Sequence, residues 1–144
     1  MKLLLLISAP FLLYAQEAPP VVGSIKIARG SVTVHRGTSD IVAMEGAHLQ
    51  AHDSLRTGAN GALGIILQDG TRVSMGPNTV LEIDRFVYEP ASGTFGMLLR
   101  LTRGVIAYIS GKMAEFSPAS IRVETPVGIV GLRGTEMAIS LEGA

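Results

Sequence analysis

The sequence lacks cysteine and tryptophan and has few aromatic residues of any kind. Its 144 residues include no Cys and no Trp, and aromatic side chains make up 5%. The absence of cysteine excludes disulfides, thiol catalysis, zinc knuckles and a lipidated N-terminal cysteine. Hydrophobic residues still make up 47% of the chain, enough to bury a core without covalent staples. The shortage of rings predicts that this core is aliphatic.

An excess of charge of one sign is also missing. Twelve basic residues balance twelve acidic ones, so the formal net charge is zero. A neutral chain lacks the positive surface of a general nucleic-acid binder. A bilayer-spanning helix needs about 20 apolar residues, and no stretch of that kind follows the first fifteen residues. The length fits one domain.

The first fifteen residues have the order of a secretory signal peptide. Lys2 gives a positive start, residues 3–13 form an apolar run, and Ala15 offers a small residue for cleavage. An N-terminal membrane anchor is the alternative, although the run is short for one. Leu13 occupies a position where a small residue is preferred, so the cleavage point stays open. We expect a signal peptide at 1–15, a linker at 16–22 and one domain at 23–144.

Beyond the linker, apolar and polar residues alternate in short runs. Leu81 and Ile83 alternate with Glu82 and Asp84, which puts two apolar side chains on one face of a strand and two acidic ones on the other. No window of twelve residues shows a helical stripe. The sequence therefore predicts an all-β fold, with helix only in the signal segment. The same alternation occurs at residues 25–27, 32–34, 73–75, 99–101 and 121–124.

Turn residues separate these runs. Asp69-Gly70 lies between two apolar runs, which predicts a hairpin with a two-residue type I′ turn. A corner between successive coils of a solenoid is the alternative. Residues 25–34 recur in pattern at 99–108, each with an Arg-Gly pair at its centre. This echo favours stacked coils or a duplicated sheet over coincidence.

Each Arg-Gly pair is interpreted as a corner. Glycine adopts backbone angles that other residues avoid, and an arginine stem can cover the turn while its guanidinium bonds exposed carbonyls. We predict that Gly134 has a positive φ or lies against a close neighbour. The alternative for Arg29, Arg103 and Arg133 is an aligned ladder that binds an acidic glycan or an acidic partner loop.

Several motifs resemble those of FecR-type periplasmic domains. They include residues 30–34, 53–58, 67–71, 76–79 and 101–104, and the best match is residues 123–137. Within that last stretch, Thr125-Pro126 followed by Arg133-Gly134-Thr135 is the most specific part. The resemblance covers residues 23–140. The resemblance and the predicted corners together select a set of structural or partner-binding motif residues. These are Arg29, Gly30, Asp69, Gly70, Arg103, Gly104, Thr125, Pro126, Arg133, Gly134 and Thr135.

The resemblance implies a β-solenoid-like stack of short strands located outside the cytoplasm. In signalling members such a domain senses an outer-membrane transporter and relays to a sigma factor through a transmembrane helix and a cytoplasmic anti-sigma segment. Only a signal-like run precedes the domain here, so we expect a stand-alone exported member. The chain stops soon after residues 137–141, which implies a fragment or an edge covered by a partner or a second copy.

No arrangement of side chains predicts catalysis. His48 and His52 would share a face of a helix, but on a strand they lie about 13 Å apart, too far for one metal ion. Glu82 and Asp84 are interpreted as a solvated face. We therefore expect no enzyme activity, no metal and no cofactor.

The expected function is that of an exported interaction or sensing module of the cell envelope, in the periplasm or secreted, which binds an envelope protein or a second copy. A cell-wall or acidic-polysaccharide binder is the alternative, and a sigma-factor regulator is a further one. Nucleic acid and stable membrane insertion are not expected.

Overall fold

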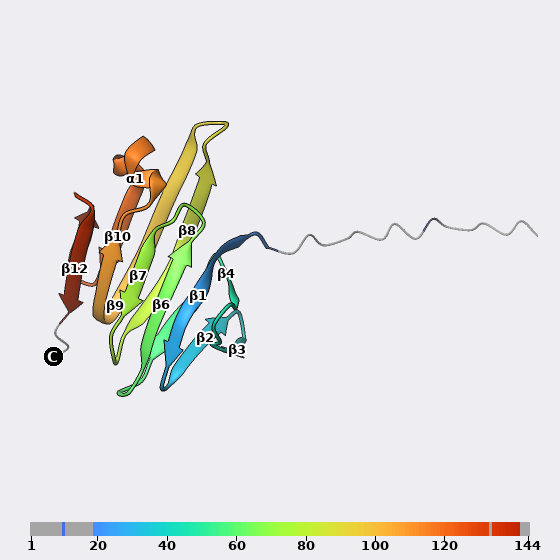
Figure 1. The fold of residues 1–144 in the computed structure, drawn as a ribbon, viewed down its shortest axis with the longest axis vertical. Helices are drawn as coiled ribbons and strands as arrows, with labels where there is room; N and C mark the ends of the chain where they lie inside the picture. Colours follow the sequence, from blue (N-terminus) through green and yellow to red (C-terminus); the bar gives the residue numbers. More distant parts are fainter. Residues whose placement is uncertain (1–9, 11–18, 133, 142–144) are drawn as a thin grey trace, which may run out of the picture.

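The computed structural model describes residues 10, 19–132 and 134–141. These residues form a single curled sheet, a half-barrel with a short helix beside it (Figure 1). The predicted signal peptide lies outside the described residues except for Pro10. The first strand begins at Val21, so regular structure starts two residues before the expected boundary at 23. The all-β prediction is confirmed.

Twelve strands are described, and β9 is the longest of them. Around it the sheet divides into two halves, β4-β1-β6-β7-β9-β12 and β3-β2-β5-β8-β9-β10-β11. The bounds of the strands are β1 Val21–Arg29, β2 Val32–Arg36, β3 Ser39–Val42, β4 His48–Gln50, β5 Ser54–Thr57, β6 Ala62–Leu67, β7 Arg72–Met75, β8 Val80–Glu89, β9 Thr94–Ile109, β10 Ile121–Thr125, β11 Gly128–Gly131 and β12 Glu136–Leu141.

Strand β9 belongs to both halves because it bends at Gly104. Before the bend β9 pairs with β8 and β10, and after it with β7 and β12. Gly104 has a φ of +96°, and a Cβ there would collide with the Thr79 hydroxyl. The two ends of β9 meet across the core, where the Tyr108 hydroxyl lies 3.9 Å from the sulfur of Met97. The bend therefore closes the sheet around the core.

The core is aliphatic, as the composition predicts. Tyr108 is the only aromatic side chain among the buried hydrophobic residues that the structure describes. Burial raises the pKa of Tyr108, and the nearby Asp69 carboxylate raises it further. Hydrogen bonds with Thr71 and Ser110 lower this pKa in part. The fully buried aliphatic side chains with no exposure are Ile25, Leu49, Leu55, Leu81, Ile83, Leu99, Leu101, Ile106 and Val123.

The stacked coils of a solenoid are not confirmed. Such coils place strands in parallel register, whereas the described strands pair antiparallel except for β9 with β10. Asp69-Gly70 does lie in a hairpin, between β6 and β7. The predicted two-residue turn is wrong, since Leu67 N–H donates to Thr71 O at 2.8 Å and leaves residues 68–70 as the loop. Gly70 has a positive φ, of +88°, and Asp69 does not.

The sequence echo marks two crossings of the chain. At Gly30, with a φ of +66°, the chain leaves β1 in one half and enters β2 in the other. At Gly104 it crosses in the opposite sense without leaving β9. The glycine part of the corner interpretation therefore agrees with the structure, although the first position is a turn and the second a bend. The predicted hydrogen bonds from Arg29 and Arg103 to carbonyls do not occur among the described residues.

A short helix contradicts the expectation that helix is confined to the signal segment. Helix α1 (Lys112–Phe116) is followed by a 3₁₀ turn, η1 (Pro118–Ser120). Its first residues donate to Asp69: Lys112 N–H to the carbonyl at 2.8 Å and Met113 N–H to the carboxylate at 3.2 Å. Tertiary contacts thus hold this helix, and five residues are too few to show a helical period in the sequence.

Candidate functional site

The arginine ladder does not form. Arg29 pairs with Ala62 at the end of β1, and Arg103 pairs with Val80 of β8. Strands β6 and β7 lie between β1 and β9, so the two arginines do not stack. Arg133 lies outside the described residues. The acidic-polysaccharide alternative therefore loses the feature that suggested it.

The other motif residues stabilise turns. The buried Asp69 carboxylate accepts from Thr71 N–H at 3.0 Å and from Thr71 Oγ1 at 2.8 Å, besides holding α1. Thr125 Oγ1 donates to Gly128 O at 2.9 Å across the β10–β11 turn, which Pro126 starts. These residues sit in separate turns, so sequence reasoning found structural positions rather than one site.

Gly134 and Thr135 lead into β12. Gly134 has a φ of +91°, which confirms the prediction of a positive φ, and a Cβ added there would meet no neighbour within 4 Å. Its carbonyl accepts from Ser110 Oγ at 3.0 Å, and Thr135 O accepts from Ser110 N–H at 2.8 Å. Together these bonds fix the start of β12 beside the end of β9.

A buried ion pair holds the turn that precedes β5. Arg36 donates from Nε and from its terminal nitrogen to the two carboxylate oxygens of Asp53, each at 2.8 Å. Asp53 has no exposed surface and also accepts from Gln50 N–H at 2.8 Å. The hydrogen bond with Asp53 raises the pKa of Arg36 further, against desolvation. The pair fixes the 51–53 turn relative to β2.

Charged side chains line up across the outer face of the half that contains β8. Sheet register places Glu82 beside Arg100 and Arg100 beside Glu124. Arg100 contacts three carboxylates: Asp84 at 3.3 Å, Glu124 at 3.5 Å and Glu82 at 4.0 Å. The acidic alternation predicted for β8 is therefore confirmed, with Ile83 buried between Glu82 and Asp84.

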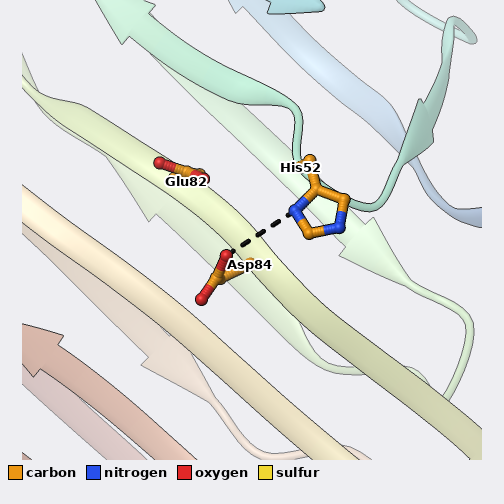
Figure 2. Close-up of side chains that lie close together, drawn as sticks. All are labelled: His52, Glu82 and Asp84. Atoms are coloured by element: carbon orange, nitrogen blue, oxygen red, sulfur yellow. Dashed lines mark ion pairs between the residues drawn. The ribbon is translucent and has the colours of Figure 1, made fainter. Parts of the chain in front are cut away.

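His52 reaches this row from the turn between β4 and β5. Its Nδ1 lies 3.6 Å from Asp84 Oδ1, and Figure 2 shows the imidazole pointing toward Asp84 over β8. One potential ligand atom each from His52, Glu82 and Asp84 lies within 4.8 Å of the others. His48 lies on β4 and does not belong to this group, so the spacing of the two histidines gave no clue. Periodicity alone does not relate residue 52 to residues 82 and 84.

Strands β11 and β12 each end one half of the sheet on the β9 side, and each has an unpaired edge. Among the described residues, β12 pairs with β9 alone and β11 pairs with β10 alone. Val127 and Ile129 on the β10–β11 hairpin are 88% and 64% exposed. β-branched residues exposed on an unpaired hairpin are typical of a surface that another chain covers.

A groove of about 430 Å³ opens next to this hairpin. Its lining combines the apolar side chains Phe95, Leu98 and Ile129 with the basic Arg85 and Arg122. The acidic Glu124 also lines it and is paired with Arg100. Neither Arg85 nor Arg122 makes an ion pair with a described residue. The groove is therefore suited to a ligand that carries both acidic and apolar groups.

Comparison with known proteins gives one match. The family model described as FecR protein matches residues 53–144. No curated protein and no solved structure matches the chain. No helix among the described residues is long and apolar enough to cross a membrane.

Proposed function

Because the chain belongs to the FecR family, we propose that it is an exported, non-enzymatic protein of the cell envelope that acts by binding another protein. The FecR domain supports a sensing or regulatory module of the envelope. The predicted signal peptide at 1–15 would direct it to the periplasm or the outside of the cell.

The observation that carries the proposal is the free edge of β12. Its residues alternate between exposed and half-buried, with Met137, Ile139 and Leu141 on the core side. The other edge of the strand has no partner among the described residues. Its backbone groups can accept one more strand, which is how many domains bind an extended segment of a partner. We propose that another envelope protein adds such a strand.

The groove beside the β10–β11 hairpin, which no β12 residue lines, would be a second contact for the same partner and would supply specificity. An added strand offers backbone hydrogen bonds that are the same for every sequence, so side chains must select the partner. Arg85 and Arg122 favour acidic side chains, while Phe95 and Ile129 favour apolar ones. The partner segment is therefore expected to carry both kinds.

Site-specific crosslinking in living cells tests the proposal. A photo-crosslinking amino acid at Ser140, exposed on β12, is compared with one at Asp40, exposed on β3 at the opposite edge of the sheet. We expect an adduct with one envelope protein from Ser140 and not from Asp40. The adduct should be lost when Arg122 is replaced by Glu.

Three outcomes would count against the proposal. Equal adducts from both positions would mean nonspecific contact, and no adduct would mean that the edge has no partner. An adduct that consists of two copies of this chain would replace the envelope partner by self-association, and sedimentation would then give a dimer. Fractionation of the same cells checks export.

A further inference from the structure

The three side chains in Figure 2 have the chemistry of a metal site and lie close together. Their ligand atoms lie within 4.8 Å of one another, so a point exists at about 2.8 Å or less from all three, against about 2.0–2.2 Å for zinc–ligand bonds. Side chains that are exposed or half-buried can close this difference by small rotations. We propose that His52, Glu82 and Asp84 bind a divalent transition-metal ion such as Zn²⁺.

The backbone places the three ligands before any ion arrives. His52 N–H donates to Ile83 O at 2.6 Å, and Ile83 N–H donates to Asp53 O at 3.0 Å. Ile83 is fully buried, so Glu82 and Asp84 on either side of it face outward together. The turn with His52 is thus bonded to the residue between the two carboxylates, which lowers the entropy lost on binding.

The charges around the cluster leave room for a dication. Glu82, Asp84 and Glu124 carry three negative charges, and Arg100 contributes one positive charge. With a neutral imidazole, these four charged side chains have a net charge of −2, which a divalent ion offsets. Arg56 on the neighbouring strand β5 forms no ion pair with these carboxylates. An uncompensated excess of this kind costs free energy at a partly buried surface, and the ion removes that cost.

Arg100 does not take the place of the ion. It bonds Asp84 through Oδ2, whereas Oδ1 faces His52. A carboxylate that binds a metal through one oxygen is commonly held by a hydrogen bond through the other, which fixes its orientation. Arg100 is therefore a positioning residue for this site.

The donor set decides the class of metal. One imidazole nitrogen and two carboxylate oxygens suit zinc and neighbouring divalent transition metals, while calcium and magnesium prefer oxygen ligands alone. His52 is 76% exposed, so water would complete the coordination. This inference does not depend on the proposed binding of a protein partner.

Titration calorimetry with zinc chloride, using the full chain, tests the inference. We expect one zinc ion per chain and a loss of affinity of at least tenfold in His52→Asn. Asparagine is chosen because His52 has a φ of +72°, which asparagine tolerates well. His48→Asn is the matched control, since His48 is exposed on the adjacent strand β4. His35→Asn removes the half-buried histidine that contacts another carboxylate, Asp40.

The controls should bind zinc within about twofold of the unchanged chain. Zinc should also raise the unfolding temperature of the unchanged chain and of both controls, but not of His52→Asn, because an ion that binds the folded state stabilises it. The inference is overturned if His52→Asn binds zinc as well as His48→Asn does, if no zinc binds, or if magnesium chloride gives the same heat.

Discussion

The ion pair between Arg36 and Asp53 offers a direct test of how the turn before β5 is held. Replacing Arg36 with Leu leaves a carboxylate without exposed surface and with a single remaining donor, Gln50 N–H. Breaking a buried pair in this way costs about 3–5 kcal/mol. The Arg36 side chain is 31% exposed, so in the variant water can partly take over its hydrogen bonds to Asp53. We therefore expect a loss near the lower end, about 3 kcal/mol.

A double-mutant cycle separates the pair from its surroundings. Asp53→Asn keeps an oxygen for Gln50 N–H but loses the charge, and we expect a loss of about 2 kcal/mol. The double variant removes both charges and should lose less than the sum of the two single losses, with a coupling of about 2 kcal/mol.

Urea unfolding followed by far-ultraviolet circular dichroism measures these losses, because the chain has no tryptophan for fluorescence. A coupling below about 0.5 kcal/mol would refute the reasoning, since two charges in direct contact, one of them fully buried, should not behave additively. His48→Asn serves as the surface control and should change stability by less than about 0.5 kcal/mol.

Three further predictions concern the bend, the turn before β12 and the buried tyrosine. Gly104→Ala should lower the free energy of unfolding, measured in urea, by more than about 1 kcal/mol, because Gly104 has a positive φ and an added Cβ would collide with Thr79. Gly131→Ala is the control and should lower it less, because the space around Gly131 is open. Equal losses of stability would contradict the role of the bend. Gly134→Ala should lower the free energy of unfolding by about 1 kcal/mol and with it the melting temperature, because Gly134 has a φ of +91°. A loss of stability well below that value would show that the backbone at residue 134 can adopt a negative φ. The raised pKa of Tyr108 means that the folded state binds its proton more tightly than the unfolded state, so stability is present below about pH 10 and falls as the pH rises above it. Tyr108→Phe should flatten this alkaline slope in unfolding curves measured on both sides of pH 10, and an unchanged slope would assign the effect to another group.

Local patterns in the sequence identified the strands and most of the turns. The alternation over residues 81–84 predicted which side of β8 is buried, and Asp69-Gly70 predicted a hairpin. These features depend on neighbouring residues, so they can be read from a short stretch. The turn type was missed because the bond between Leu67 and Thr71 sets the loop length.

Features that depend on distant contacts were missed. The antiparallel order of the sheet depends on pairings such as β2 with β5, which no short stretch encodes. Helix α1 forms because Asp69, more than forty residues earlier, receives its first N–H groups. His52 and Asp84 are brought together by the pairing of β5 with β8, so the candidate metal site was invisible in the spacing of the histidines.

The continuous course of β9 through both halves has a consequence for how the molecule opens. Strands β7, β8, β10 and β12 all hydrogen-bond to it, so the loss of β9 removes a pairing partner from both halves at once. A fold joined in this way unfolds as one cooperative unit rather than as two. Backbone amides in β7 and in β8 should then exchange with solvent through the same global opening, although the two strands lie on opposite sides of the bend.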